Sequence, residues 1–350
     1  MSTLLVTGFP GFLASNVIPR ILAQRPDDEV VCLVEGRFME LAKTRVAGYP
    51  QALAPRIRLL AGDITEAGLG VKGTDLNPSE VFHFAALYDL MVSRALGMKV
   101  NVEGTRNVVR FAENCSNLNF LHYVSTCYVS GRYAGAFRET DLDKGQRFNN
   151  YYEETKFLAE VEVQRSSAPW IIYRPSVVAG DSKTGATLKY DGPYPVIRWL
   201  LRQPRFFALM PAMGDPSTCR FNLVTQDFVL DALCHLSLHA REKGRVYQLA
   251  DPNPLTVGEM VAELGRSTGR TVISMPVPLG LTKFVLGQFP KLSKWCGFTP
   301  AMVDYFVHPT HYLTDATCAA LKGSGVVCPD IRQVLPNLVR YVRSHPEPVG

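Results

Sequence analysis

The feature that most limits what this chain can fold into is the alternation, through its first half, of short β-branched runs with helical periods. Strands that are apolar on both faces and separated by amphipathic helices form a parallel sheet covered on both sides, with right-handed crossovers. The sequence therefore predicts a doubly wound α/β fold. The expected strands are TLLVT, EVVCLVE, RIRLLAGDI, VFHFAA, NFLHYVST and PWIIYRP, and the expected helices cover residues 12–24, 38–46, 100–114 and 152–165.

A glycine-rich turn, TGFPGFLA at residues 7–14, follows the first expected strand and opens the first expected helix. Gly8 permits a tight turn, Gly11 lets the backbone approach a pyrophosphate, and Ala14 is small enough for close helix–strand packing. An ordinary βα turn is the alternative, but the place of this turn at the start of a βαβ series favours dinucleotide binding and a Rossmann-type sheet. The turn residues expected to contact the cofactor are Gly8, Pro10, Gly11, Phe12 and Leu13.

Two residues at the end of the second strand would contact the adenosine ribose, and they favour different cofactors. A carboxylate at Glu35 accepts from a free 2′-hydroxyl and favours NAD, whereas the guanidinium of Arg37 pairs with a 2′-phosphate and favours NADP. The alternative for both is a surface ion pair. After the third strand, Asp63 and Ile64 are expected at the adenine ring, with turn capping as the alternative for Asp63.

The candidate catalytic residues are a Tyr and a Lys four apart in YEETK, together with a hydroxyl at the end of the fifth strand. Tyr152 and Lys156 project from one face of the expected helix, and a lysine beside the phenol, with the positive nicotinamide, would lower its pKa toward the working range. Thr126 ends a strand at the edge where doubly wound sheets bind ligands, so its hydroxyl would hold the substrate oxygen against Tyr152. Helix surface is the alternative for Tyr152 and Lys156 taken alone.

Two further positions fit a cofactor lying along the same edge. Ala85 and Ala86 after the fourth strand would let it lie flat against the backbone. Asn101 either orients a polar network there or starts the next helix as a cap.

After Pro175 the strand–helix rhythm changes to a loop over residues 179–195, followed by helices expected at 227–240, 257–268 and 331–344. We expect residues 1–175 to form the NAD(P)-binding domain, its sheet completed by a strand near 245–250, and residues 176–350 to form mainly a smaller C-terminal substrate lobe. The loop before Tyr194 is expected to fold over the substrate. Lys189, Tyr190 and Arg220 are the candidate substrate residues, with exposed loop as their alternative.

The segment 279–306 is rich in large apolar side chains, for which core packing is the expected explanation and a lipophilic pocket or dimer face the alternative. These side chains are Phe284, Leu286, Phe289, Trp295, Phe298, Tyr305 and Phe306.

Composition excludes several other classes. The net charge of +5 is spread along the chain without a basic run, which argues against nucleic acid as a partner. The eight cysteines form no CxxC pair and no zinc spacing, so they are expected in the core, with no metal, in a reducing cytoplasm. No signal peptide and no integral membrane segment are expected, because no apolar run approaches about 20 residues.

Taken in order, the motifs TGFPGFLA, GDIT, HFAA, NVEGT, YVSTCYVSG, YEETK and YRPSVVAGD resemble those of the extended short-chain dehydrogenase/reductases. Within that family the chain is similar to the thioester-reductase or fatty-acyl-CoA-reductase branch, through GFPGFLA, CLV, GDITEAGLG and STCYVSG. The resemblance implies a catalytic set at Thr126, Tyr152 and Lys156, with a nicotinamide contact from Pro175 to Val178.

The resemblance also implies hydride delivery from NADPH to an acyl thioester, aldehyde or ketone, and dimerisation through helices of the sheet domain. Two residues depart from that branch. Glu35 stands where the branch often carries arginine, which keeps NAD(H) open beside NADP(H), and Pro19 is expected to kink the first helix.

The main functional hypothesis is an NAD(P)H-dependent reductase of an apolar carbonyl or acyl-thioester substrate, a small molecule. A nucleotide-sugar epimerase or dehydratase would share the cofactor and catalytic residues but return the hydride to its substrate. A cofactor-sensing protein with an inactive site is the third class, against which the Thr, Tyr and Lys set argues.

Overall fold

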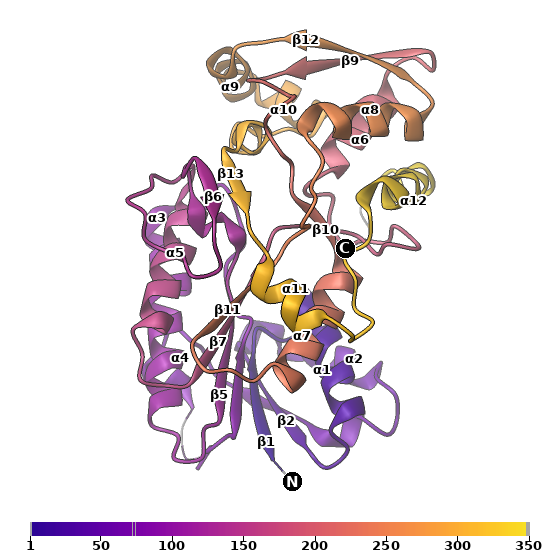
Figure 1. Cartoon of the computed structure of the whole chain (residues 1–350). Helices are drawn as coiled ribbons and strands as arrows, with labels where there is room; N and C mark the ends of the chain where they lie inside the picture. Colours follow the sequence, from indigo (N-terminus) through magenta and orange to yellow (C-terminus); the bar gives the residue numbers. More distant parts are fainter. Residues whose placement is uncertain (1, 72, 74, 348–350) are drawn as a thin grey trace.

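The computed structural model describes residues 2–71, 73 and 75–347. Within these residues, seven parallel strands form the central sheet in the order β11-β7-β5-β4-β1-β2-β3 (Figure 1). The strands are β1 (Thr3–Thr7), β2 (Glu29–Val34), β3 (Ile57–Ala61), β4 (Glu80–His83), β5 (Phe120–Val124), β7 (Trp170–Pro175) and β11 (Arg245–Leu249). The direction in which successive strands are added reverses between β1 and β4, which is where such sheets bind ligands.

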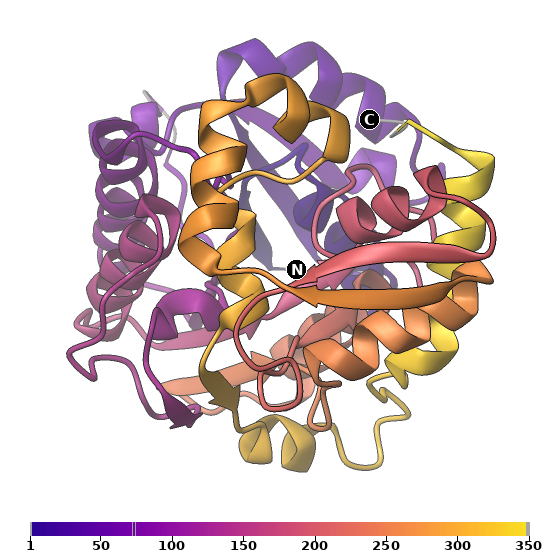
Figure 2. The same cartoon turned by 90° about the horizontal axis from the view of Figure 1, so that it is seen from above.

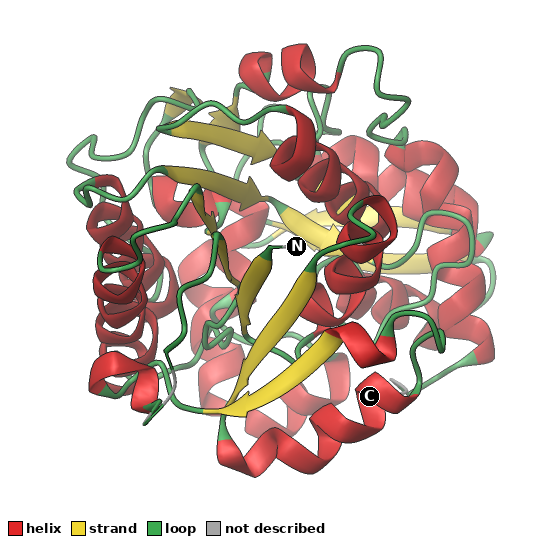
Figure 3. Cartoon of the chain, turned by 90° about the horizontal axis from the view of Figure 1, so that it is seen from below, coloured by secondary structure: helices red, strands yellow, loops and turns green. Residues whose placement is uncertain are grey.

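Helices cover both faces of this sheet, as Figure 3 shows from below. On one face, Leu4 and Val6 of β1 pack in a core with α1 (Phe12–Gln24) and α7 (Gln226–His239). On the other face, Leu5 packs in a second core with α4 (Gly104–Glu113) and α5 (Tyr151–Gln164). Alternate residues of one strand therefore serve two cores, and the predicted doubly wound α/β fold is confirmed.

Pro19 lies inside α1, yet the helix continues through it from Phe12 to Gln24. A proline lacks the N–H that would bond to the carbonyl four residues earlier. Here the Tyr49 hydroxyl donates to that Ser15 carbonyl at 2.7 Å. A tertiary hydrogen bond thus replaces the missing helical one, which the sequence alone did not indicate.

The helix expected at 100–114 begins earlier. Ser93 caps α3 (Arg94–Gly97), a π-helical turn follows at Met98–Glu103, and α4 completes the rod. A smaller shift occurs at α2 (Met39–Ala47), which begins one residue later than expected and follows a 3₁₀ turn at Gly36–Phe38.

The lobe above the sheet has its own core and is seen from above in Figure 2. Its helices are α6 (Tyr194–Arg202), α8 (Val257–Thr268), α9 (Leu279–Gln288), α10 (Pro290–Cys296) and α12 (Ile331–Ser344). Short parallel pairs join β8 (Val177–Ala179) to β10 (Leu223–Thr225), β9 (Phe207–Ala212) to β12 (Thr271–Pro276), and β6 (Gly135–Phe137) to β13 (Thr310–Tyr312).

The second half of the chain does not stay in the lobe. α7 and β11 belong to the sheet layers, α11 (Asp315–Leu321) contacts both, and β13 pairs with a strand of the first half. The division at residue 175 stays a prediction.

All eight cysteines are free, and four of them, Cys32, Cys127, Cys234 and Cys296, are buried, whereas Cys318 is exposed. Among the helices of the described residues, none combines the length and apolar character that crossing a membrane requires.

Candidate active site

The glycine turn after β1 has no room for side chains. Gly8 has φ +84°, and an added Cβ would lie 2.6 Å from the Ala85 nitrogen. The Gly11 nitrogen donates to the Gly8 carbonyl at 2.8 Å, and a Cβ on Gly11 would lie 2.6 Å from that same oxygen. Ala14 is fully buried, as close helix–strand packing requires. The turn therefore presents bare backbone at the start of α1, which suits a pyrophosphate.

A buried chain of hydrogen bonds holds this turn against the end of β4. The Thr7 hydroxyl lies 2.7 Å from His83 Nδ1 and accepts from the Ala85 nitrogen at 3.2 Å. His83 Nε2 lies 3.0 Å from the Thr105 hydroxyl. Burial, reinforced by the nearby Lys156 charge, lowers the pKa of His83 to about 3, so the ring is neutral. Thr7 and His83 are positioning residues that the motif analysis missed, although His83 stands in the HFAA motif.

The two candidates at the ribose end bind each other. Arg37 Nε lies 2.7 Å from Glu35 Oε1, and the two side chains are 70% and 41% exposed. The surface ion pair that we considered as the alternative is what forms, and it leaves NAD and NADP undistinguished.

At the end of β3, Asp63 Oδ1 accepts from the Thr65 nitrogen at 2.8 Å and so caps the following turn. Ile64 is buried beneath Gly104, where an added Cβ would lie 2.8 Å from Ile64 Cδ1. The adenine contact at Asp63 and Ile64 stays a prediction.

Asn101 joins the loop after β4 to the helix that carries the tyrosine. Its Oδ1 accepts from the Leu87 nitrogen at 2.7 Å, and its Nδ2 donates to the Thr155 hydroxyl at 3.1 Å. Asn101 is buried within the continuous helix, which begins at Arg94, so the helix-start alternative is wrong. Its bonds fix the backbone just beyond Ala85 and Ala86 relative to α5.

Thr126 and Tyr152 meet in a buried corner at the carboxyl edge of the sheet. The Thr126 hydroxyl accepts from the Tyr128 nitrogen at 3.3 Å and donates to the Pro175 carbonyl at 3.4 Å. Tyr152 lies in the first turn of α5, which Asn150 caps. Burial and the neighbouring Tyr88 raise the pKa of Tyr152 well above its usual value, and a hydrogen bond with the Thr126 side chain only partly opposes this.

Lys156 is turned toward the sheet. Its Nζ donates to the Tyr123 hydroxyl at 2.7 Å and to the Val124 carbonyl at 2.8 Å. Burial lowers the pKa of Lys156 to about 7, with the Glu160 carboxylate opposing that shift. The ammonium is engaged with Tyr123 and Val124, and the expectation that Lys156 together with the nicotinamide lowers the pKa of Tyr152 stays a prediction.

Tyr123 was not among the predicted site residues, although the two-residue period of β5 could have pointed to it. Residues 121 and 123 lie on the face that packs on α5. Behind Lys156, Glu160 binds the fully buried Arg174 of β7 with Nε–Oε1 at 3.0 Å and accepts from Ser125. This ion pair fixes α5 on the sheet.

The segment after β7 closes the site from the side. The Pro175 carbonyl receives the Thr126 hydroxyl, and Val178 lies in β8. Between them, the Ser176 hydroxyl is buried without a hydrogen-bond partner among the described residues. An orphaned polar atom at this place, together with the bare Gly8 turn, fits a bound dinucleotide.

Tyr88 is a further site residue that the sequence did not reveal. Its ring packs edge-on against Tyr152, with centroids 5.2 Å apart at 86°. The Tyr88 side chain is 51% exposed, and partial burial, followed by the carboxylates of Asp191 and Asp89, raises its pKa. Tyr88 thus lies between the candidate acid and the loop before α6.

Among the described residues, no hydrogen bond joins the three candidate substrate residues to Tyr152. Tyr190 donates to the His345 carbonyl and stacks on Tyr194 at 5.0 Å, while Arg220 donates to the Pro254 carbonyl at 3.0 Å. Lys189 is exposed. The loop itself is tied to α12, because Asn337 donates to the Ser182 carbonyl at 2.8 Å. The expectation that this loop folds over the substrate stays a prediction, since the Asp191 carboxylate of the same loop lies near Tyr88.

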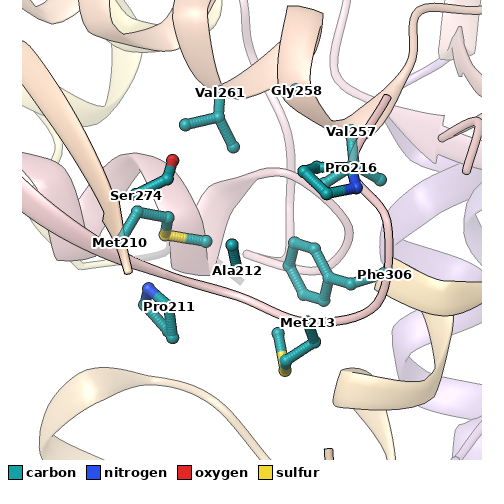
Figure 4. A pocket seen from close by; sticks show the side chains of 10 residues that line it. All are labelled: Met210, Pro211, Ala212, Met213, Pro216, Val257, Gly258, Val261, Ser274 and Phe306. Carbon is teal, nitrogen blue, oxygen red and sulfur yellow. The ribbon is translucent and has the colours of Figure 1, made fainter. Parts of the chain in front are cut away.

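An apolar crevice under the β9–β12 pair is too small for a substrate (Figure 4). Its volume is about 10 Å³, room for about one water. It is lined by Met210, Pro211, Ala212, Met213, Pro216, Val257, Gly258, Val261, Ser274 and Phe306.

Comparison with known families and proteins agrees with this architecture. The model of an NAD-binding family described as male sterility protein matches residues 6–233. Probable fatty acyl-CoA reductase 4 of Arabidopsis thaliana is 28% identical over 194 residues, and a linear gramicidin synthase of Brevibacillus parabrevis is 26% identical over 281 residues. These matches cover 46% and 74% of this chain but only 38% and 5% of the relatives, so the chain spans a minor part of their length.

Solved structures show the same fold. The terminal R domain from the myxalamid PKS-NRPS biosynthetic pathway has a TM-score of 0.82 at 23% identity, covering 99% of this chain and 91% of that one. UDP-glucuronic acid 4-epimerase from Bacillus cereus, in complex with NAD, has a TM-score of 0.63 at 17% identity, covering 98% and 97%. Both likenesses concern the fold.

Proposed function

The chain belongs to the male sterility family of NAD-binding proteins, within the thioester-reductase-like branch of the extended short-chain dehydrogenase/reductases, and from this premise we propose that it reduces an apolar aldehyde, ketone or acyl thioester. The observation that carries the proposal is the buried corner where the Tyr152 phenol meets the Thr126 hydroxyl. That corner lies at the carboxyl edge of the sheet, as does the bare Gly8 turn.

In the proposed reaction the substrate oxygen sits between Thr126 and Tyr152. The Thr126 hydroxyl positions that oxygen, and the Tyr152 phenol gives it a proton. The phenol is protonated at neutral pH, so in the proposed reaction it can give its proton to the substrate oxygen as the hydride arrives. Lys156 and Tyr123 lie behind it, joined by a 2.7 Å hydrogen bond, and would restore the proton.

A nicotinamide cofactor, when bound, would supply the hydride to the carbonyl carbon. The residues that would hold it are the Gly8–Leu13 turn at the pyrophosphate, Ala85 and Ala86 along the ring system, and Ser176 with Val178 at the nicotinamide end. Glu35 and Arg37 would lie at the ribose. With a thioester substrate, the products of the first hydride transfer and protonation would be an aldehyde and a free thiol.

An apolar substrate is supported by the walls around this corner. Tyr88 packs on Tyr152, while Val177 and Leu90 pack against the lobe core, to which the buried Tyr128 also belongs. Two of the relatives are, by name, reductases of fatty acyl-CoA. Apolar contacts of this kind favour an acyl chain over a sugar.

The test is cofactor oxidation, followed by absorbance, with NADH and NADPH separately against long-chain aldehydes, ketones and acyl-CoA thioesters. We expect net oxidation with at least one of these substrates, and a loss of about 10²- to 10⁴-fold in Tyr152→Phe. Tyr151→Phe is the matched control, because the Tyr151 side chain next to it is 47% exposed. Turnover of a UDP-sugar without net cofactor change would instead identify an epimerase, and equal activity in both variants would remove Tyr152 from the mechanism.

A further inference from the structure

One end of the lobe exposes an unusual number of large apolar side chains. They belong to β9, β12, α9, α10 and the turn before β9, which lie together at the top of Figure 1 and nearest the viewer in Figure 2. We call this surface the apolar end. Its members are Phe206, Phe207, Ile273, Met275, Leu281, Phe284, Phe289, Leu292 and Trp295, with exposures from 39% to 86%.

The β9–β12 pair is apolar on both faces but covered on only one. Ala208 and Met210 of β9 are buried in the lobe core above α6 and α8. Phe207 stands opposite Thr271 and Leu209 opposite Ile273, so these residues share the other face. On that face Phe207, Ile273 and Met275 are 46%, 49% and 45% exposed. Parallel strands are normally covered on both faces, so this face lacks a partner.

Helices α9 and α10 continue the exposed surface. Leu281 and Phe284 are three residues apart on α9, and both are more than half exposed, at 53% and 61%. Phe289, Leu292 and Trp295 repeat the three-residue spacing along α10. This finding corrects the core-packing expectation for Phe284, Phe289 and Trp295, whereas Leu286 and Tyr305 are buried as expected. Spacing of this kind places each set on one helical face.

Cations outnumber carboxylates around the apolar end, where Glu263, Asp304 and Glu347 are each paired with a cation. Residues 192–214 and 264–303 contain no Asp or Glu, but they contain Arg198, Arg202, Arg205, Arg266, Arg270, Lys283, Lys291 and Lys294. Four of these cations, Arg202, Arg205, Lys291 and Lys294, are exposed and form no ion pair with any carboxylate of the described residues. The surface is therefore complementary to an anionic partner.

A basic recess of about 710 Å³ borders the apolar end. Its walls carry five arginines and one carboxylate: Arg198, Arg202, Arg205, Arg270, Arg343 and Glu347. Arg270 and Arg343 both donate to the Thr268 carbonyl, so they partly serve the end of α8. Arg202 lies over the Trp295 ring at 5.9 Å and so connects the recess with the apolar end.

We propose that the apolar end and the basic recess dock the protein on an anionic phospholipid bilayer, with Phe284, Phe289 and Trp295 entering the acyl boundary and Arg202 and Arg205 binding headgroup phosphates. The apolar side chains lie on the outer faces of α9, α10 and the β9–β12 pair, which suits a bilayer interface. A second copy of this chain is a poor occupant, because a two-fold interface would place the same unpaired cations against each other.

The experiment is co-sedimentation of the full chain with vesicles of phosphatidylcholine alone and of equal parts phosphatidylcholine and phosphatidylglycerol. We expect binding to the anionic vesicles to be about tenfold or more tighter and to weaken with salt. The triple variant Phe284→Ser, Phe289→Ser, Trp295→Ser and the double variant Arg202→Gln, Arg205→Gln should each reduce it about tenfold or more. A double variant at exposed apolar residues elsewhere, Leu41→Ser with Val327→Ser, should leave it unchanged.

Thermal unfolding of each variant reports whether the fold is kept, and the exposed arginines give a second test if the triple variant is unstable. No binding to either vesicle, or binding that neither variant weakens, overturns the proposal. So does concentration-dependent dimerisation, or capture of a purified acidic carrier protein, that the triple variant abolishes while vesicles never bind. Vesicle binding is measured without substrate, so its failure leaves the proposed reductase activity standing.

Discussion

Two buried charged groups at opposite ends of the central sheet, Glu80 and Lys156, differ in how their charge is compensated. At the amino end, the Glu80 carboxylate lies 2.7 Å from Arg241, 3.1 Å from Arg25 and 3.1 Å from His122 Nε2. At the carboxyl edge, no carboxylate of the residues that the structure describes forms an ion pair with the buried Lys156. The paired carboxylate of Glu80 stabilises the fold, whereas Lys156, which forms no ion pair, is a group whose protonation a ligand can change.

The pKa values express the same contrast. Burial alone would raise the pKa of Glu80, but the hydrogen bond and charge of His122 and the Arg25 guanidinium outweigh it and hold the pKa at about 2. At Lys156 the Glu160 carboxylate opposes burial only in part, and burial brings the pKa down to about 7. A pKa shifted toward neutral pH is typical of a functional site, whereas a pKa shifted away from neutral pH is typical of a structural ion pair.

The largest expected effect is on activity at Lys156, where a substitution should change stability very little. We expect Lys156→Met to lower kcat/KM about 10²- to 10⁴-fold. The free energy of unfolding should change by only about 1 kcal/mol, because removing an unfavourably buried cation offsets two lost hydrogen bonds. Lys99→Met on an exposed helical face is the control. A variant that keeps most of its activity would contradict the functional assignment of this edge.

The converse is expected at Glu80. Glu80→Gln leaves Arg25 and Arg241 facing a neutral group and should lower the free energy of unfolding by about 3–5 kcal/mol, measured by urea denaturation. Activity per folded molecule should not change. Glu154→Gln breaks a more exposed pair with Arg94, 2.7 Å long, and should cost less than about 1 kcal/mol. Equal losses in the two variants would show that the amino-end cluster is not the stabilising one.

Acid sensitivity tests the same cluster. Because the pKa of Glu80 is lowered to about 2 in the folded chain from 4.5, its contribution to stability is present above pH 4.5 and is lost as the pH falls through about 2. Denaturation midpoints measured between those values should fall with pH in the parent chain. They should fall less steeply in Glu80→Gln, and parallel curves would contradict this account.

The smallest effect is expected at the exposed ribose end. Glu35→Ala frees Arg37 from its partner and should shift the ratio of kcat/KM for NADPH over NADH upward by about tenfold. Stability should change by less than about 0.5 kcal/mol, because an exposed pair contributes little. A ratio that does not move would mean that neither side chain reads the ribose.

The sequence predicted the layers and most element boundaries because their hydrophobic periods are strong. Helices 12–24, 257–268 and 331–344 have the bounds that the sequence predicted. The first six residues of the helix that begins at Arg94 were not foreseen, because Gly97, a poor helix former, stands among them. Periodicity also could not tell that Phe284, Phe289 and Trp295 face outward, since an apolar stripe looks the same whether or not an element covers it.

By itself the sequence determined a doubly wound sheet, the bare backbone turn at Gly8 and Gly11, and the appearance of Thr126, Tyr152 and Lys156 in a fixed order. Only the tertiary structure decided which groups those side chains meet: Tyr123 for the lysine, Tyr88 for the tyrosine, and each other for Glu35 and Arg37. The physical reason is the distance along the chain over which each kind of interaction acts. Local patterns fix backbone conformation within a few residues, whereas burial and pairing depend on segments that the fold brings together from far along the chain.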